Sequence, residues 1–287
     1  MKRNIYVISQ DPKFFFRLNK ELKKLKIPFK ILNLGQRIPN VDSIVLTTLQ
    51  EIFKIKKYNE NKVNIIPYKS GENFEKYILE ILKVYQCGNS TPEQIMFSID
   101  PGKSLGLVVF FNGYFLYSET LFKEESLIAH INNFIKYLEL DEKKKIKLIF
   151  KFGRGVLPLT LKLISIIYSI FREKFNLSIY LINEAKTSKI KFHKLSDEIS
   201  KHEASAFLLA LRKGIKVNKE NYKKFVELIK SDRRFQQELE KEIQDIKFLN
   251  RNINFVKSLF LELLNCKITI NEAYNLINKK RVIKEII

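Results

Sequence analysis

The sequence predicts an α/β protein in three parts: a small parallel-sheet domain over residues 1–86, a mixed α/β domain over 95–214, and a helical region over 215–287. Two observations carry this prediction. Short apolar runs of strand length alternate with stretches whose apolar residues have helical spacing, as is typical of α/β domains. The turn and breaker residues of segment 87–92, Cys-Gly-Asn-Ser-Thr-Pro, then separate the first two parts.

The first part begins with an apolar run at residues 4–9 and a basic amphipathic stretch at 12–26. Further strands are expected at residues 29–34, 43–48 and 63–66, and a helix at about 72–84. This order resembles a response-regulator receiver. The end of the third strand, where such a domain carries its phospho-accepting aspartate, reads Thr47-Thr48, so we expect no phosphotransfer there.

The middle part is expected to form a mixed sheet of five strands. Three come first, at residues 95–100, 105–111 and 114–119, with Asn112-Gly113 as a hairpin turn. They are followed by a helix at 123–138, a strand at 146–152, a helix at about 158–175, a strand at 178–182 and a closing helix at 197–212. From residue 218 onward the pattern is helical, and Thr269 to Glu272 has the form of a capping box.

The chain has a formal net charge of +21, from 52 Lys and Arg against 31 Asp and Glu. Such a field attracts a polyanion, and nucleic acid, as DNA or structured RNA, is the leading candidate. A composition rich in Lys and Ile is also what an AT-rich genome or a thermophile's surface produces, and this alternative stays open. We expect a cytoplasmic protein that does not bind a membrane, because the sequence has neither a membrane-length apolar run nor a signal peptide.

Cys87 and Cys266 are far apart in the sequence, which favours reduced thiols over a disulfide framework or a zinc site. Asp100 ends the apolar run 95–100 and starts an Asp-Pro-Gly turn. A carboxylate at a strand end is held rigidly at the rim of a sheet, where Mg²⁺ or Mn²⁺ can meet a phosphate. The alternative is a structural aspartate in a common type of turn.

Three strands, a helix, two strands separated by a helix, and a closing helix are the order of elements in an RNase H-like fold. Residues 97–109, Phe-Ser-Ile-Asp-Pro-Gly-Lys-Ser-Leu-Gly-Leu-Val-Val, resemble the opening strand of RuvC-type resolvases and YqgF-type nucleases. An archaeal-type branch of this group also fits. The resemblance implies that residues 95–214 form a nuclease domain in which Asp100 binds catalytic Mg²⁺ or Mn²⁺.

Residues 179–189, Ile-Tyr-Leu-Ile-Asn-Glu-Ala-Lys-Thr-Ser-Lys, resemble a strand of YqgF-type proteins that ends in Asp-Glu-Arg. Glu184 aligns with that glutamate, which implies a second metal ligand. RuvC proper has its second carboxylate one strand earlier, where this chain has residues 151–155, Lys-Phe-Gly-Arg-Gly, and this favours the YqgF-like layout. After Glu184, four side chains are candidates to donate to phosphate oxygens, unless they only form a polar loop: Lys186, Thr187, Ser188 and Lys189.

Residues 201–214 resemble the closing RuvC helix, and alignment on Ala206 puts His202 at its first metal position and Ser205 where its last aspartate belongs. Helical spacing places Glu198, His202 and Ser205 on one face, so Glu198 is a candidate to restore the missing charge. Glu203 projects to a different side. Which acid completes the site, Glu198 or Glu203, stays open.

Together these resemblances imply a divalent-metal-dependent nuclease that acts on branched or structured nucleic acid. Two metal ions would activate water and stabilise the leaving oxygen, and an enzyme with one metal ion also stays open. The basic residues expected to hold phosphates are Lys103, Lys151, Arg154, Lys186 and Lys189. The rival interpretation is a non-catalytic DNA- or RNA-binding protein in which Ser205 marks a degenerate site. A homodimer, or protein partners bound through the flanking domains, also stays open.

Overall fold

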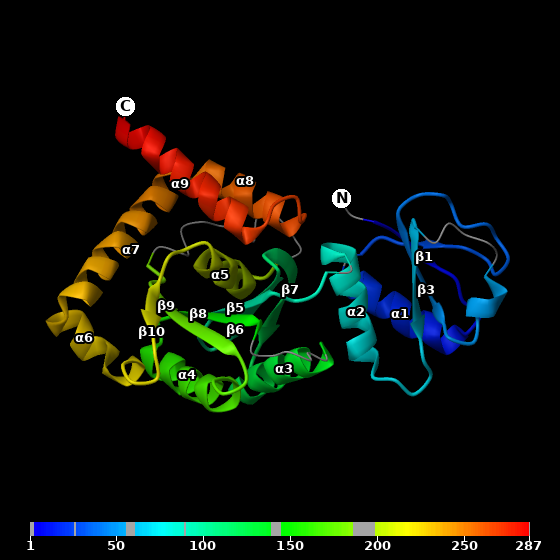
Figure 1. Ribbon diagram of the computed structural model, residues 1–287, viewed down its shortest axis with the longest axis horizontal. Coiled ribbons are helices and arrows are strands. Elements are labelled where there is room, and N and C mark those ends of the chain that lie inside the picture. The colour runs from blue at the N-terminus through cyan, green and yellow to red at the C-terminus, as the bar shows by residue number, and fades with distance from the viewer. Residues whose placement is uncertain are drawn as a thin grey trace. The chain divides into compact units, whose positions relative to one another are not determined.

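The computed structural model describes residues 3–25, 27–55, 61–88, 90–138, 145–185 and 199–286. It divides into two compact units, Met1–Asn89 and Ser90–Ile287, and each is described by itself. The predicted fold class is confirmed: one parallel sheet of 4 strands, one mixed sheet of 6 strands, and helices at the C-terminal end of the chain (Figure 1). No helix in the described ranges is long and apolar enough to cross a membrane.

The first unit is a parallel sheet in the order β2-β1-β3-β4. Its elements are β1 (Asn4–Val7), α1 (Pro12–Lys24), β2 (Lys30–Ile31), β3 (Ser43–Thr48), η1 (Ile52–Lys54), β4 (Val63–Tyr68) and α2 (Phe74–Cys87). Strand β3 is buried along its whole length, and its apolar residues Ile44, Val45 and Leu46 are consecutive, as is typical of a strand inside a parallel sheet. Helix α1 begins where Asp11 accepts hydrogen bonds from the backbone N–H groups of Lys13 and Phe14.

The second unit contains the mixed sheet, in the order β10-β9-β8-β5-β6-β7. Its elements are β5 (Gln94–Asp100), β6 (Leu105–Phe111), β7 (Tyr114–Leu121), α3 (Glu124–Tyr137), β8 (Lys147–Gly153), α4 (Leu157–Phe171), β9 (Asn176–Ile182), α5 (Lys201–Ala210) and β10 (Ile215–Val217). Strands β5, β6 and β7 are antiparallel neighbours, whereas β5, β8 and β9 pair in parallel. Apart from β10, the order β9-β8-β5-β6-β7 is the one expected for an RNase H-like sheet.

The sixth strand, β10, was not predicted. Ile215–Val217 pairs antiparallel with β9 and extends the sheet beyond the expected five strands. Three residues are too few to show a two-residue periodicity, so the sequence pattern alone does not reveal this strand.

Helices cover both faces of the mixed sheet: α3 and α4 lie on one face and α5 on the other (Figure 1). Gly106, on β6 opposite Asp100, lets α5 approach closely, because a Cβ at this position would overlap the backbone carbonyl of His202. The closing helix is therefore held directly against the strand end that carries Asp100.

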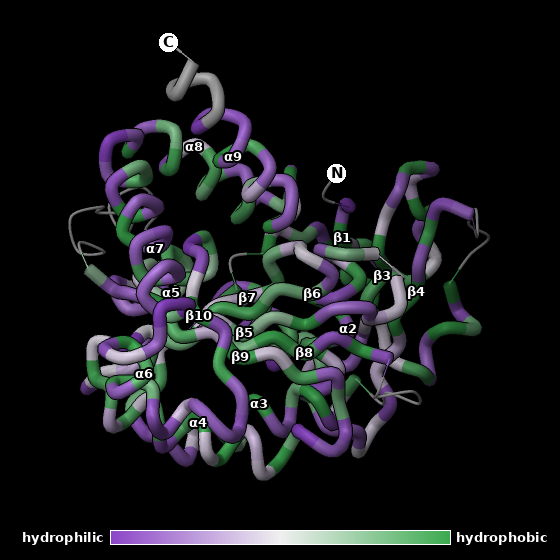
Figure 2. Tube along the Cα trace, turned by 60° about the vertical axis from the view of Figure 1, so that its left-hand side comes forward, coloured by the Kyte–Doolittle hydropathy of each residue, from purple (hydrophilic) through white to green (hydrophobic). Residues whose placement is uncertain are grey.

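The helices that follow β10 also pack on this unit. They are η5 (Tyr222–Lys224), α6 (Phe225–Ser231), α7 (Arg233–Arg251), α8 (Ile253–Leu264) and α9 (Ile270–Ile286). Phe207 of α5 contacts Phe260 of α8 with ring centroids 4.7 Å apart, inside a buried apolar cluster. Figure 2 shows hydrophobic residues along strands such as β5, β6 and β8, and many hydrophilic residues in the helices around them. The predicted capping box is confirmed, since Thr269 and Glu272 exchange side chain to backbone hydrogen bonds at the start of α9.

Candidate metal and nucleic-acid site

Asp100 and Glu184 lie at the same edge of the mixed sheet. Asp100 is the last residue of β5, and Glu184 comes two residues after the end of β9. Strands β5, β8 and β9 run parallel, so their carboxyl ends meet at one edge. The two candidate carboxylates are close enough for Glu184 to affect the ionisation of Asp100.

Burial raises the pKa of Asp100 to about 7, and the negative charge of Glu184 adds to the shift. A hydrogen bond from the Ser205 hydroxyl and the positive charge of Lys201 act in the opposite direction. Ser205 and Lys201 both lie on α5, so the closing helix supplies a donor and a cation to the Asp100 carboxylate.

Glu184 is held against the turn that follows β8. The Gly155 N–H donates to its Oε1 at 2.8 Å. A Cβ at either Gly153 or Gly155 would overlap the Glu184 carboxylate, so the Gly-Arg-Gly turn is glycine-rich in order to admit this side chain. Burial raises the pKa of Glu184, against the lowering effects of the Gly155 hydrogen bond, Arg212 and Arg154.

The donor set fits one hard divalent cation. Asp100 and Glu184 are half-buried, and both of their pKa values are raised. A divalent cation between them would stabilise the charged form of both carboxylates. The described residues hold no group of three or more His, Cys, Asp or Glu side chains suited to a metal ion. A cation here would therefore complete its coordination with water or with phosphate oxygens, as Mg²⁺ commonly does.

Helix α5 begins later than predicted, and this changes the argument for Glu198. The Ser200 side chain accepts a hydrogen bond from the Glu203 N–H, and Ser200 is the extended residue just before the helix. Glu198 precedes this cap and lies outside the described residues, so helical spacing does not place it on a face with His202 and Ser205. His202 is half-buried, one turn before Ser205.

Glu203 was considered as the acid that completes the site, and the structure contradicts this. Its carboxylate accepts hydrogen bonds from the hydroxyls of Ser118 at 2.5 Å and Thr120 at 2.9 Å, both on β7. The side chain is 9% exposed. Glu203 is a structural link between α5 and β7.

Lys151 was predicted to hold phosphate, and this is wrong because its ammonium group is buried. It donates to the carbonyls of Ala210 at 2.7 Å and Arg212 at 2.6 Å, and it contacts the Tyr274 hydroxyl. Burial lowers the pKa of Lys151 to about 7, although Asp245 opposes the shift. The side chain joins β8 to the end of α5 and to α9.

The other predicted phosphate ligands differ in their positions. Lys103 is exposed in the turn after Asp100, where a phosphate can reach it. Arg154 is mostly buried and forms an ion pair with Glu242 of α7 at 2.9 Å. Lys186, Thr187 and Lys189 lie outside the described residues. Lys201, which the sequence argument did not select, is exposed at the start of α5 and close enough to lower the pKa of Asp100.

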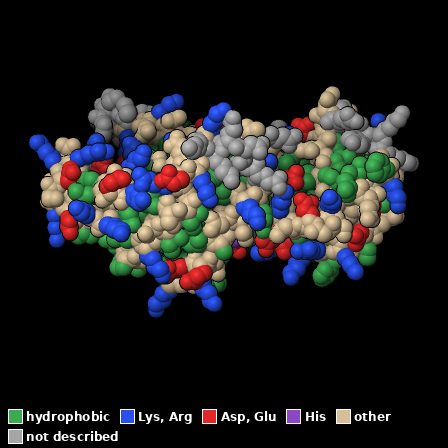
Figure 3. Space-filling view, turned by 60° about the horizontal axis from the view of Figure 1, so that its bottom comes forward, with side chains coloured by type: hydrophobic (Ala, Val, Ile, Leu, Met, Phe, Trp, Pro, Cys, Tyr) green, Lys and Arg blue, Asp and Glu red, His purple; other side chains and the backbone are tan. Residues whose placement is uncertain are grey.

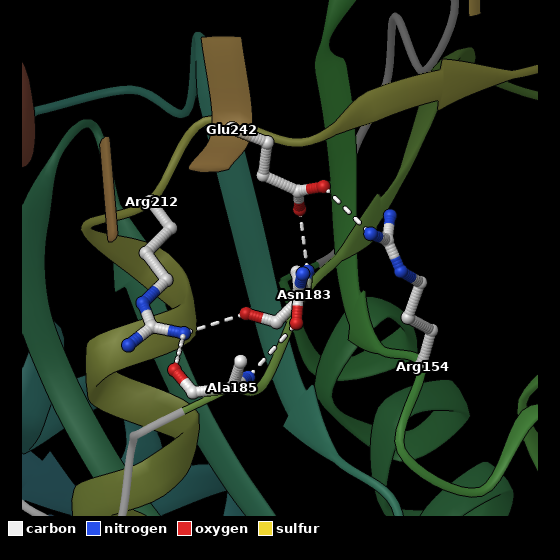
Figure 4. A network of polar contacts seen from close by, with 5 residues as sticks. All are labelled: Arg154, Asn183, Ala185, Arg212 and Glu242. Carbon is white, nitrogen blue, oxygen red and sulfur yellow. Dashed lines mark hydrogen bonds and ion pairs between the residues drawn. The ribbon is translucent and has the colours of Figure 1, made fainter. Parts of the chain in front are cut away.

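Sequence reasoning also missed Arg212 and Glu242, which contact the backbone on either side of Glu184. Arg212 Nη1 donates to the carbonyls of Asn183 at 2.5 Å and Ala185 at 3.1 Å, while Glu242 accepts from the Asn183 N–H at 2.5 Å (Figure 4). One signal was available: Glu242 belongs to an otherwise polar helix, yet its spacing from the apolar Phe235, Ile246 and Leu249 places it on the buried face.

Comparisons with known proteins give little further support. No protein-family model and no curated protein matches the chain. Two structures of Aquifex aeolicus Argonaute match at 14% and 16% identity, with TM-scores of 0.26 and 0.24. They cover 63% and 64% of this chain but 36% and 34% of their own, so the chain spans about a third of their length.

A Ppx/GppA phosphatase from Aquifex aeolicus matches at 12% identity with a TM-score of 0.13, over 69% of this chain and 70% of that one. At such TM-scores these similarities carry no argument about function. The fold is defined instead by the strand order of the mixed sheet.

Proposed function

We propose that this protein is a divalent-metal-dependent nuclease of the RuvC or YqgF type, which hydrolyses phosphodiester bonds in branched or structured nucleic acid. The observation that carries the proposal is the pair of half-buried carboxylates, Asp100 and Glu184, at the carboxyl edge of a sheet with RNase H-like strand order. Perturbed carboxylates that meet at one edge of a fold are typical of functional sites.

Asp100 and Glu184 would hold Mg²⁺ or Mn²⁺, which supplies Lewis-acid chemistry and a more acidic bound water when present. The hydrogen bond from Ser205 orients the Asp100 carboxylate, and the Gly155 N–H orients that of Glu184. Lys201 and Lys103 are exposed near Asp100, where their charges favour a phosphate group next to the carboxylates.

The charge of the chain supports a polyanionic substrate. The net charge is +21, and Figure 3 shows Lys and Arg side chains spread over the face in view and interspersed with acidic ones (Figure 3). A distributed field of this kind attracts nucleic acid without specifying a sequence. Specificity for a substrate shape would then come from the geometry around the strand ends.

A second candidate function is non-catalytic binding of DNA or RNA. Ser205 favours it, because this residue contacts Asp100 from the position where the resemblance expects an aspartate. With two carboxylates in the described part of the site, a weak cation site would bind nucleic acid without cleaving it.

One experiment separates the two functions. The protein is incubated with labelled four-way junctions, duplexes, single strands and structured RNAs, with Mg²⁺, Mn²⁺ or EDTA in parallel. Cleavage of any substrate that requires metal supports the nuclease. Binding without cleavage of any substrate supports the second candidate, and absence of binding overturns both.

A further inference from the structure

The backbone segment that carries Glu184 is fixed by side chains from outside the five strands first predicted. This segment, Asn183 to Ala185, follows β9, and the buried side chains of Glu242 and Arg212 contact its backbone (Figure 4). Glu242 accepts from the Asn183 N–H, and Arg212 donates to the Asn183 and Ala185 carbonyls. The Asn183 side chain closes the turn by accepting from the Ala185 N–H at 2.9 Å.

Glu242 and Arg212 are costly residues to bury. Glu242 is 2% exposed and Arg212 is 0% exposed. A buried charge destabilises a fold unless it is paired and hydrogen-bonded, and replacement of such a pair by apolar residues is often neutral or stabilising. The positions of these two charges therefore point to a role other than stability.

Glu242 makes a second contact that also leads to the site. Its Oε2 pairs with Arg154, which lies between Gly153 and Gly155 in the turn that receives the Glu184 carboxylate. The Glu242 carboxylate of α7 therefore contacts both the backbone next to Glu184 and the turn whose Gly155 N–H binds the Glu184 side chain.

We propose that Glu242 and Arg212 are positioning residues that hold Glu184 in its metal-binding orientation, so that helix α7 is an integral part of the site. This inference rests on the proposed function of Asp100 and Glu184 as ligands of a divalent cation. Partners behind a metal ligand commonly change metal affinity by 10 to 100-fold when they are removed, because they fix the orientation of the ligand.

The test compares Glu242→Gln with Asp245→Asn. Glutamine has one acceptor oxygen where Glu242 uses two, so one of its two contacts is lost. Asp245 is a matched control: it is also buried on α7, 3% exposed, and pairs with Arg281 of α9 instead of the Glu184 segment. Both variants break a buried ion pair of the same helix.

Two measurements are made without nucleic acid: Mn²⁺ affinity by electron paramagnetic resonance, and hydrogen exchange of the amides in residues 176–185. We expect Glu242→Gln to weaken Mn²⁺ binding by about tenfold or more and to speed exchange at Asn183. Asp245→Asn should change neither, even if its melting temperature falls as much.

The outcomes distinguish this inference from the proposed function. The positioning role is overturned if Glu242→Gln binds Mn²⁺ as tightly as the wild type does. It is also overturned if Glu242→Gln and Asp245→Asn lose Mn²⁺ affinity to the same extent. Failure of the wild type to bind Mn²⁺ overturns the metal site itself. If Glu242→Gln does not fold, Arg212→Met gives the same test, because methionine has a long side chain but no N–H to donate to the two carbonyls that Arg212 Nη1 contacts.

Discussion

The Glu184 carboxylate lies near Asp100, although Asp100 ends β5 and Glu184 follows β9, and the charge of Glu184 adds to the effect of burial in raising the pKa of Asp100. A divalent cation between the two carboxylates would lower their pKa values again, because its positive charge favours the ionised form. Asp100→Asn removes one of the two negative charges while it keeps the shape of the side chain. We expect the variant to lose cleavage and to bind Mn²⁺ at least tenfold more weakly, while nucleic-acid affinity is unchanged or higher. Cleavage at the wild-type rate by Asp100→Asn would show that the active site lies elsewhere.

Gly155→Ala tests the position of the Glu184 carboxylate. The added Cβ would overlap that carboxylate, whereas the backbone of this exposed residue is unstrained. We expect Mn²⁺ affinity to fall about tenfold, with a change in unfolding free energy of only about 0.5 kcal/mol, as for other surface positions. In a Glu184→Ala background the same change should have no effect on Mn²⁺ affinity. An effect of equal size in that background would mean that Gly155 acts through something other than Glu184.

Asp100 and Glu184 could be found from the sequence because each follows a short apolar run, and local pattern is enough to locate a strand end. The confirmed fold class rests on the same local signals. Lys151 shows where this reasoning fails. A lysine inside an apolar strand predicts an exposed side chain unless its buried partners are known. The partners of Lys151 are Ala210, Arg212 and Tyr274, which are distant in sequence. Glu242 was missed for the same reason, since its contacts are set by the packing of α7 on the sheet.

Glu198 illustrates a second limit, the uncertainty of helix boundaries. The helical face that linked it to His202 depended on a helix that begins at residue 197, whereas Ser200 caps α5 and the helix begins at Lys201. Glu198 itself lies outside the described residues, so its part in the site stays a prediction. The prediction for Lys186, Thr187 and Lys189 falls outside the described residues and stays a prediction.

Nucleic-acid binding should weaken steeply with salt, because each phosphate neutralised by Lys or Arg releases counterions. Lys201→Ala should reduce the slope of log affinity against log salt by about 0.9 on duplex DNA, the value for one phosphate contact. Lys147→Ala is the matched control, since this exposed lysine starts β8 at the opposite edge of the sheet. Fluorescence anisotropy at several salt concentrations measures both slopes. Equal reductions for the two lysines would argue for a diffuse attraction without a preferred edge.

Lys151 should make the stability of the second unit depend on pH. The pKa of Lys151 is about 7 in the folded state, against an ordinary value of 10.5. Between these pH values Lys151 is protonated in the unfolded chain and mostly neutral in the folded one. The unfolding free energy therefore rises with pH in this window, by up to about 1.4 kcal/mol per unit, and the contribution is lost as pH falls toward 7. Lys151→Met has no such proton. Hydrogen exchange of β8 amides in urea, compared at pH 7, 8 and 9, should show a steeper rise for the wild type, and parallel pH dependences would contradict a buried neutral lysine.

The Ser205 hydroxyl donates to Asp100 from the position where the family resemblance expects an acid. Ser205→Asp replaces this donor by a third carboxylate beside two whose pKa values are already raised. Without metal the added charge is repelled, and we expect the unfolding free energy to fall by about 1–3 kcal/mol.

With Mn²⁺ bound, we expect the Ser205→Asp substitution to stabilise the protein, because a third carboxylate oxygen offsets more of the cation's charge. The increase in melting temperature on addition of Mn²⁺ should be larger for Ser205→Asp than for the wild type, since a ligand that binds only the folded state stabilises it in proportion to the logarithm of its affinity. Ser205→Asn, which is similar in shape but uncharged, should show no larger increase than the wild type. If the Asp and Asn variants respond alike to Mn²⁺, then position 205 does not face the cation, and the site proposed around Asp100 must be redrawn.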